Sequence, residues 1–457
     1  MSRFHRLSNF TFLSLACLLS IVLHSQFAVA DDWPQWLGPK RDSVWREKGI
    51  VREFPEDGPP VLWRTPIAAG YSGPAVAAGR VYVTDRKLPE GESNPSNPFA
   101  RGETPGSERV LCLDAKSGNI VWKHEYECKY TVSYPSGPRT TPLVADGKVY
   151  TLGAEGHLFC LDATRGTVVW SRELTKDYKI ETPLWGFSAS PLLDGDRLIC
   201  IVGGEESVVV AFDKNTGKEL WRALSATEPG YCPPMIYSVG GRRQLIIWHP
   251  QAVNGLDPAS GEVYWSVPFS ARSGLSIATP RVLGNRLLVS SFYEGSLMLE
   301  LTDEKPYARE VWKSTSRNER NTDKLHALMC SPYLEAGHIY GVCSYGQLRC
   351  LKVDTGERLW ENLTATGSTG STRSRTDRWA NAFLIKSGDR FFLPNEKGDL
   401  IIAKMSPAGY EEVSRAHLLE PTDPSPGRDV VWSHPAFANK AVYMRNDKEI
   451  ICVDLAE

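Results

Sequence analysis

The sequence predicts an all-β chain folded as an eight-bladed β-propeller, each blade being a four-stranded antiparallel sheet. Three observations support this: one hairpin recurs along the chain, a proline-containing pair opens each repeat, and the last repeat lacks a strand. The hairpins recur about every 44–53 residues. Such a spacing, with four strands per unit, is typical of propeller blades. Seven blades are the alternative count.

The clearest copy of the hairpin is Ala211 to Trp221, with the sequence AFDKNTGKELW. One strand ends at Asp213, the chain turns at Thr216 and Gly217, and a second strand closes on Trp221. Asp and Asn favour turns because their side chains bond to nearby backbone, and Gly supplies the positive φ that the turn requires. The flanking β-branched, aliphatic and aromatic residues suit a pleated sheet.

Six hairpins close on a tryptophan at the same position. These residues are Trp122, Trp170, Trp221, Trp265, Trp312 and Trp360. The seventh copy has Val413 where the tryptophan is expected, and the eighth stops just after Asp454. A buried indole covers roughly 150–250 Å², so we expect these side chains to fasten neighbouring blades together. Their predicted role is structural.

Seven repeats open with a residue followed by proline, and an eighth has a weaker version. The opening pairs are Gly73-Pro74, Thr141-Pro142, Ser190-Pro191, Pro233-Pro234, Thr279-Pro280, Ser331-Pro332, His434-Pro435 and, in the weaker copy, Ala382-Phe383. Each pair precedes an apolar strand and a Gly or Asp turn. The openings therefore predict where each blade begins.

The eighth repeat lacks its last strand, and the residues 60–65 (PVLWRT) offer a strand that has no repeat of its own. Within it, Trp63 occupies the place of a hairpin tryptophan. A closed ring leaves no sheet edge of the array unpaired. We therefore predict that the N-terminal strand completes the last blade and closes the propeller.

Residues 1–30 have the pattern of a secretory signal peptide. A basic start (Arg3, His5 and Arg6) precedes an apolar run from Phe10 to Leu23, and 28–30 form a small-x-small cleavage site. The sequence thus predicts export to the periplasm or the extracellular space. No stable transmembrane segment is expected after cleavage.

Two further regions make up the predicted mature chain. Residues 31–59 are rich in Pro, Gly and charge, and we interpret them as a strap anchored by Trp33, Trp36 and Trp45. A ligand-binding role for these indoles is the alternative. Residues 60–457 form the propeller domain. Within it, the Pro-, Gly- and Ser-rich insertions 86–108 and 364–377 are expected to be solvated surface loops.

Composition excludes several classes of function. The net charge of −2, with mixed signs, does not suit a nucleic-acid-binding protein, which would present a basic face. Nine of the ten cysteines follow the signal segment, without a CxxC pair or zinc-ligand spacing. Four share one repeat position, Cys112, Cys160, Cys350 and Cys452. We interpret these four as small buried strand residues.

The segment 211–221 fits the pattern A-x-D-x-x-T-G-x-x-x-W, which resembles the repeat of pyrroloquinoline quinone (PQQ) dehydrogenases and their non-enzymatic relatives. The resemblance, which extends from Pro60 to the C-terminus, implies the PQQ-like, quinoprotein alcohol dehydrogenase-like propeller family that includes BamB-type scaffolds. In the dehydrogenases the quinone stacks between a Trp and a vicinal disulfide, above a calcium ion. This chain has no adjacent cysteine pair.

The expected function is therefore a binding or scaffold module for a protein or a small ligand, acting as a monomer. It has no catalytic residue, metal or firmly assigned cofactor. The alternative is a PQQ-dependent oxidoreductase that acts on alcohols or sugars. In that case PQQ would be the cofactor.

The segments just before the blade openings are expected to line the channel mouth of the propeller. They carry Tyr71, Arg139, Trp185, Tyr231, His326, Arg378, Trp379 and Trp432. Aromatic faces beside arginines suit a planar or anionic small ligand, or a peptide segment. In the alternative interpretation these side chains simply fill the channel.

Overall fold

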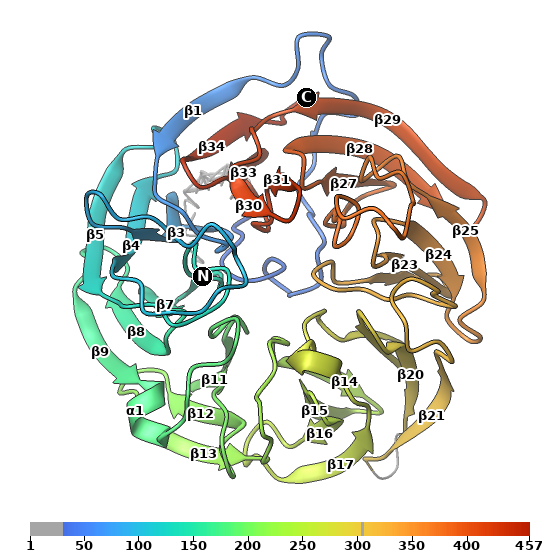
Figure 1. The fold of residues 1–457 in the computed structure, drawn as a ribbon, viewed down its shortest axis with the longest axis horizontal. Coiled ribbons are helices and arrows are strands. Elements are labelled where there is room, and N and C mark those ends of the chain that lie inside the picture. The colour runs from blue at the N-terminus through green and yellow to red at the C-terminus, as the bar shows by residue number, and fades with distance from the viewer. Residues whose placement is uncertain (1–30, 303–305) are drawn as a thin grey trace, which may run out of the picture.

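The computed structural model describes residues 31–302 and 306–457, and within them eight four-stranded antiparallel sheets form a ring (Figure 1). The prediction of an all-β, eight-bladed propeller is confirmed. The helices of this part of the chain are α1 (Leu174–Tyr178) and the 3₁₀ turn η1 (Arg272–Gly274). The predicted signal segment lies outside the described residues.

The first four blades follow one another along the chain, each with its strands in sequence order. Blade 1 contains β2 (Ala75–Ala77), β3 (Arg80–Lys87), β4 (Ser107–Asp114) and β5 (Ile120–Glu127). Blade 2 contains β6 (Leu143–Ala145), β7 (Lys148–Leu152), β8 (His157–Asp162) and β9 (Val168–Glu173). Blade 3 contains β10 (Leu192–Asp194), β11 (Arg197–Ile201), β12 (Val209–Asp213) and β13 (Glu219–Ala223). Blade 4 contains β14 (Met235–Val239), β15 (Arg242–His249), β16 (Ala252–Leu256) and β17 (Val263–Pro268).

Blades 5 to 7 repeat this arrangement, and a small hairpin precedes blade 8. Blade 5 contains β18 (Arg281–Leu283), β19 (Arg286–Ser291), β20 (Gly295–Leu301) and β21 (Ala308–Lys313). Blade 6 contains β22 (Tyr333–Glu335), β23 (His338–Val342), β24 (Leu348–Lys352) and β25 (Arg358–Asn362). Blade 7 contains β26 (Ile385–Ser387), β27 (Arg390–Pro394), β28 (Asp399–Ser406) and β29 (Gly409–His417). The small hairpin is β30 (Asp423–Ser425) with β31 (Arg428–Val430), and blade 8 contains β32 (Ala436–Ala438), β33 (Ala441–Arg445), β34 (Glu449–Asp454) and β1 (Val61–Pro66).

Burial falls from the inner strands of a blade to its outermost strand. In blade 3, Val209 to Phe212 of β12 are fully buried, whereas Leu220 of the outer strand β13 is 47% exposed. Apolar side chains on both faces of the inner strands suit sheets that pack against a neighbouring blade on each side. The hydrophobic core is therefore distributed between blades around the ring.

The recurring hairpins fasten most blades to the next, as predicted, although Trp265 of blade 4 bonds to Gln244 of its own blade. The indole of Trp122 in blade 1 lies against Gly166 in the hairpin of blade 2, where a Cβ atom would stand 2.4 Å from the ring. Gly166 also has a φ of +70°, so this position needs glycine for both conformation and space. The Nε1 of Trp122 donates a hydrogen bond of 3.0 Å to the carbonyl oxygen of Ala163.

The same docking recurs in the following blades. Gly217 receives Trp170 and Gly261 receives Trp221, with added Cβ atoms at 2.6 and 2.5 Å from the respective indoles. Cys112, Cys160, Cys350 and Cys452 lie directly opposite the tryptophans of their own blades and are fully buried. Their interpretation as small buried strand residues is confirmed.

The N-terminal strand closes the ring, as the sequence predicts. Strand β1 pairs with β34, and Trp63 stands opposite Cys452, the register that Trp122 has with Cys112 in blade 1. The Nε1 of Trp63 donates a 3.0 Å hydrogen bond to the carbonyl oxygen of Ala115 in blade 1. Residues from opposite ends of the chain thus join the last blade to the first (Figure 1).

The assignment of Val413 to the tryptophan position of blade 7 is wrong by one residue. Ser414 stands opposite Ile402 in this register, and Val413 occupies the bulge that precedes the tryptophan in the other blades. The Oγ of Ser414 accepts a 3.0 Å hydrogen bond from the backbone N–H of Phe54 in the strap. The strap therefore supplies an aromatic residue beside the blade that lacks its tryptophan.

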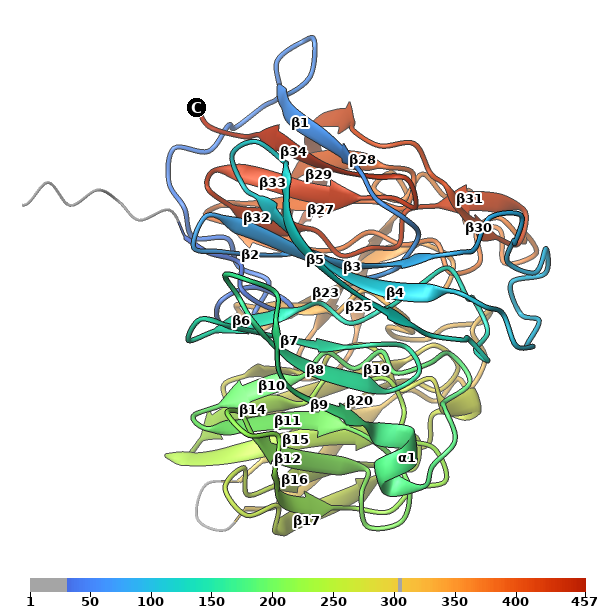
Figure 2. The ribbon, with the colours of Figure 1, turned by 90° about the vertical axis from the view of Figure 1, so that its left-hand side faces the viewer.

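The N-terminal strap 31–59 crosses one face of the ring, and its indoles anchor it there (Figure 2). Trp33 and Trp45 are each 1% exposed, which confirms them as anchors. The guanidinium of Arg41 donates to the carbonyl oxygens of Pro191 and Pro234, at 2.9 and 3.2 Å. The strap thus ties the openings of blades 3 and 4 together across the channel.

Candidate ligand site in the propeller channel

A cavity of about 370 Å³ lies where the inner ends of the blades meet. Its wall is mostly aromatic and apolar, with two arginines and a few hydroxyl groups. The lining residues are Trp36, Tyr71, Phe99, Tyr134, Arg139, Trp185, Ser188, Ser190, Tyr231, Pro233, Ser273, Leu275, Ile277, Tyr293, Leu328, Met329, Arg378, Trp379, Phe383, Trp432 and His434. The cavity has the size and the composition of a small-molecule pocket.

The structure brings seven of the eight predicted channel residues to this cavity. They are Tyr71, Arg139, Trp185, Tyr231, Arg378, Trp379 and Trp432. The eighth, His326, does not line the cavity; Leu328 and Met329 do so in its place. Sequence reasoning missed several other lining residues, among them Phe99, Tyr134, Tyr293 and His434.

One end of the cavity is closed by the strap. Trp36 packs on the imidazole of His434 with ring centroids 4.8 Å apart, and its Nε1 donates a 3.0 Å hydrogen bond to Thr279 Oγ1. Phe383 also packs on this imidazole, with ring centroids 4.8 Å apart. Trp36 is therefore both an anchor of the strap and part of the cavity wall.

The opposite end is covered by the loop between β3 and β4, which lies on the face away from the strap (Figure 2). Phe99 of this loop packs edge-on against Tyr134 at 5.0 Å and against Trp379 at 5.9 Å. The expectation that the insertion 86–108 is a solvated loop is wrong for Arg86 and Glu108, which are buried in β3 and β4, whereas Phe99 is 43% exposed and also contacts the cavity wall. Phe99 is the single aromatic residue of that Pro-, Gly- and Ser-rich insertion, and this isolation is the feature of the sequence that could have indicated its contact with the cavity.

Three lining residues have a left-handed backbone conformation although none is glycine. These are Tyr134, Ser273 and Trp379, with φ of 54°, 58° and 68°. Such conformations cost of order 1–3 kcal/mol each and concentrate at functional sites. The wall is therefore held in place by the surrounding structure at some cost in stability.

The two arginines at this end are arranged over aromatic faces. Arg139 lies 5.2 Å from the ring centre of Tyr71 and donates to the backbone carbonyl oxygens of Ser133 and Tyr134, at 2.9 and 2.6 Å. Arg378 lies 4.8 Å from the ring centre of Trp379. The two guanidinium groups place positive charge beside the aromatic wall, where Arg378 is paired with Glu319 and Arg139 is held by backbone carbonyl oxygens.

Hydrogen bonds from behind the wall hold two of these side chains. Arg378 donates to Glu319 Oε1 and to Tyr293 Oη, each at 3.2 Å. Trp432 donates from Nε1 to Glu396 Oε2 at 2.9 Å, and Arg428 of the hairpin β30–β31 bonds to the same carboxylate. Glu396 thus fixes the orientation of the Trp432 indole.

A buried carboxyl group also lies behind the wall. Asp423 Oδ1 accepts hydrogen bonds from Tyr71 Oη at 3.1 Å and from Ser136 Oγ at 2.7 Å. Burial raises the pKa of Asp423 well above its usual range, and the neighbouring Asp447 carboxylate raises it further. Both effects disfavour the charged form of Asp423, whose Oδ1 connects the hairpin β30–β31 to Tyr71.

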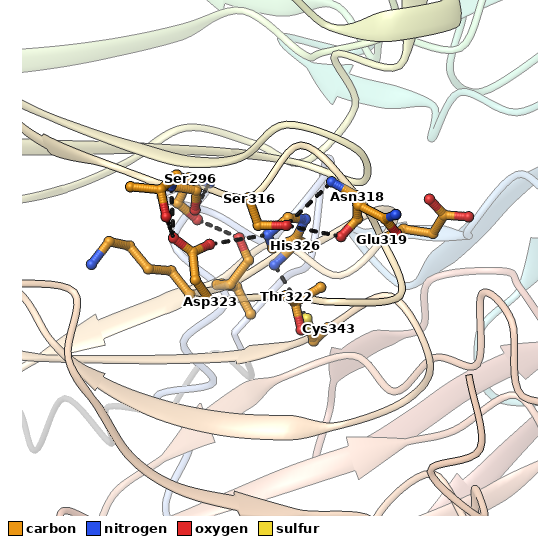
Figure 3. Close-up of polar contacts among 12 residues, drawn as sticks. Ser296, Ser316, Asn318, Glu319, Thr322, Asp323, His326 and Cys343 are labelled. Atoms are coloured by element: carbon orange, nitrogen blue, oxygen red, sulfur yellow. Dashed lines mark hydrogen bonds and ion pairs between the residues drawn. The ribbon is translucent and has the colours of Figure 1, made fainter.

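His326 belongs to a separate buried polar cluster (Figure 3). Its Nδ1 lies 3.1 Å from the carbonyl oxygen of Phe292, and its Nε2 lies 3.5 Å from Asp323 Oδ1. Its backbone N–H points to the sulfur of Cys343 at 3.3 Å. The ring is fully buried and does not line the cavity, so His326 is not placed to contact a ligand there.

The resemblance to PQQ dehydrogenases implies two bound groups, a planar quinone and a calcium ion. The aromatic faces, together with Arg139 and Arg378, fit a planar anion such as PQQ. The lining set contains no carboxylate, and residues 31–302 and 306–457 contain no group of three or more His, Cys, Asp or Glu placed to hold a metal ion. The lining of the cavity thus has the chemistry for a planar anion and offers no carboxylate to a metal ion.

The ring and its axial cavity define the protein as a PQQ-like repeat propeller. The family model described as outer membrane protein assembly factor BamB matches residues 106–362 and 304–457. The chain belongs to this family. No curated protein matches it significantly.

Solved structures share the fold at low sequence identity. BamB from Moraxella catarrhalis is 16% identical with a TM-score of 0.53, covering 86% of this chain and 98% of its own. Quinohemoprotein alcohol dehydrogenase from Comamonas testosteroni is 12% identical with a TM-score of 0.62, covering 93% and 80%. Quinohemoprotein alcohol dehydrogenase ADHIIG from Pseudomonas putida HK5 is 13% identical with a TM-score of 0.58, covering 93% and 80%. These likenesses concern the fold.

Proposed function

We propose that this protein is a binding module whose axial cavity takes a planar, anionic small ligand. The observation that carries the proposal is the pair Arg139 and Arg378, each held over an aromatic ring at one end of an aromatic-lined cavity. Planar ligands stack on such rings, and a carboxylate would bond to the guanidinium groups. A peptide segment that presents an aromatic side chain beside an acidic one would satisfy the same groups.

The second candidate is a PQQ-dependent oxidoreductase of alcohols or sugars. It is favoured by the likeness of the fold to the quinohemoprotein alcohol dehydrogenases. PQQ is itself planar and anionic, so it is a suitable probe for both candidates. When bound, it would supply two-electron redox chemistry, while Arg139 and Arg378 would hold its carboxylates.

One titration separates the two candidates. Purified protein is mixed with PQQ, with and without calcium, while quinone absorbance and dye reduction in the presence of alcohols or sugars are recorded. The binding module predicts a quinone absorbance change without turnover. Dye reduction would establish the oxidoreductase, and the absence of any absorbance change would exclude PQQ as the ligand.

The placement of the site is tested by variants of the same protein. Trp185→Ala and Trp379→Ala should each weaken quinone binding by about 5- to 150-fold, because loss of a stacked base or ring costs roughly 1–3 kcal/mol. Arg165→Gln is the matched control, since Arg165 is exposed on the outside of blade 2 and pairs with Asp162. Unchanged affinity in both tryptophan variants would refute this placement.

We also propose that the protein is exported, to the periplasm or beyond, and acts as a monomer. The basic and apolar pattern of residues 1–30 supports the first point. No helix in residues 31–302 and 306–457 has the length and apolar character needed to span a membrane. Fractionation of cells and mass determination of the N-terminus would test export, which predicts a chain beginning at Asp31.

A further inference from the structure

The strap end of the cavity contains a histidine with one uncommitted ring nitrogen. His434 is 5% exposed, and its Nδ1 lies 2.8 Å from the carbonyl oxygen of Pro435. A carbonyl oxygen only accepts hydrogen bonds, so Nδ1 carries the proton. In the neutral ring, Nε2 is then an unprotonated acceptor.

The surroundings of His434 keep the imidazole neutral. Trp36 and Phe383, which both line the cavity, pack on it at 4.8 Å. Among the described residues, no charged side chain shifts the pKa of this imidazole. Burial lowers the pKa of His434 to about 4. The acceptor at Nε2 therefore persists at neutral pH.

Within the described part of the chain, no hydrogen bond reaches Nε2 of His434, although neighbouring polar groups are paired. Trp36 Nε1 donates to Thr279 Oγ1 at 3.0 Å, and Ser190 Oγ accepts from the backbone N–H of Thr141 at 3.1 Å. His434 lines the cavity, and a ligand donor that reached Nε2 would satisfy this acceptor. His434 thus provides a specific hydrogen-bonding position in the cavity wall.

The arginines and this acceptor lie at opposite ends of the cavity. Arg378 adjoins Trp379, which contacts Phe99 of the loop on one face of the ring. His434 contacts Trp36 of the strap on the other face (Figure 2). A ligand that uses both features must carry complementary groups at its two ends.

We propose that the ligand is a planar aromatic carboxylate with a hydrogen-bond donor on the edge opposite the carboxylate, and that His434 Nε2 accepts this donor. The inference rests on the proposed function, because it assumes that the cavity binds a planar anion. The donor would be a ring N–H or a hydroxyl group. An analogue without a donor would leave the nitrogen uncovered, which is how buried polar groups generate specificity.

The experiment compares two probes of the same outline on the full chain by titration calorimetry. Indole-5-carboxylate has a ring N–H, and 1-benzothiophene-5-carboxylate has a sulfur atom in its place. One neutral hydrogen bond predicts about 3- to 10-fold tighter binding of the indole. In His434→Phe, which keeps an aromatic ring without the acceptor, both probes should bind with equal affinity.

A pH series on the unaltered protein provides a second measurement, should His434→Phe fail to fold. The indole preference should hold from about pH 8 to about pH 6 and disappear toward about pH 4, because protonated Nε2 no longer accepts. Comparing the ratio of the two affinities cancels the titration of the carboxylates that both probes share. A preference that survives at low pH or in His434→Phe would overturn the inference.

Two outcomes separate this inference from the proposed function. If both probes bind the unaltered protein equally, the role of His434 is overturned while binding of planar anions stands. If neither probe binds, the proposed function itself fails for this class of ligand. An indole preference that is lost in His434→Phe is the expected result.

Discussion

At the scale of single residues, the hairpin glycine of blades 1 to 4 determines how closely the preceding blade approaches. Gly166 contacts the Trp122 indole, and a Cβ atom there would lie far inside van der Waals contact. Asp162 Oδ1 accepts a 3.0 Å hydrogen bond from the backbone N–H of Thr164, so the turn is fixed on its other side as well. Both the Trp122 indole and the turn that contains Gly166 are therefore held in place.

Gly166→Ala should therefore lower stability more than Gly147→Ala. Both glycines have positive φ, +70° and +71°, but Gly147 has no atom within 4 Å of an added Cβ. The Gly147 variant carries only the conformational cost of about 1–2 kcal/mol, whereas the Gly166 variant adds the clash with Trp122. Urea unfolding of both variants measures the difference, and equal losses would contradict the docking role.

The buried carboxyl pair predicts a pH dependence. Because the folded pKa of Asp423 is raised above its ordinary value of 3.8, the folded state binds more protons, and the contribution of this group to stability falls as pH rises through the folded pKa. Asp423→Asn retains an acceptor for Tyr71 and Ser136 without the charge. The free energy of unfolding of the variant relative to the unaltered protein should increase with pH.

Asp323→Asn provides a control of opposite sign. Although burial raises the pKa of Asp323, hydrogen bonds from Thr315 and His326 lower it to about 2. Its contribution to stability is present above the ordinary pKa and is lost as pH falls through about 2. Thermal unfolding from acid to mildly alkaline pH should give trends of opposite direction, and a pH-independent difference for Asp423→Asn would refute the raised pKa of Asp423.

At the scale of elements, β1 is the strand whose loss would open the ring. Two adjacent residues within β1 offer a matched comparison, because Trp63 is 8% exposed and Leu62 is 55% exposed. Trp63→Ala should cost about 3–5 kcal/mol, the usual range for a truncated buried Trp. Leu62→Ala should change stability by less than about 0.5 kcal/mol. Chemical denaturation measures the free energy of unfolding of both variants. Similar losses of stability in the two would contradict closure through the Trp63 indole.

The strap is the second element whose role depends on long-range contacts. The backbone N–H of Val51 donates at 2.9 Å to the carbonyl oxygen of Leu455, which follows the last hairpin Asp. In blade 2 the corresponding carbonyl, that of Ala163, accepts from a tryptophan Nε1. Backbone from the strap thus replaces the missing indole at the junction of blades 7 and 8.

At the scale of the whole molecule, the repeats made the fold predictable from the sequence. The period determined the blade count, and the absent last strand indicated β1 as the closing strand. The site was less predictable because its residues lie in segments that do not repeat. Phe99 reaches the cavity from a long insertion, and Trp36 from the strap, so no alignment of repeats could place them.

The two errors of position have physical causes. The position of His326 before a blade opening predicts a channel residue, but its backbone N–H meets the sulfur of Cys343 and its ring is buried. Val413 was assigned without accounting for the bulge that precedes each docking position. Neither the bulge nor the direction of a non-repeating loop can be obtained from residue spacing alone.

The central claim is that the axial cavity binds a planar anion. Hydrogen–deuterium exchange of the full chain, with and without saturating indole-5-carboxylate, tests it most directly. Protection should appear in the segments that carry Arg139, Trp185, Arg378 and His434, and the outer strands β5, β9 and β13 should be unaffected. Protection confined to those outer strands, with none around the cavity, would contradict the account.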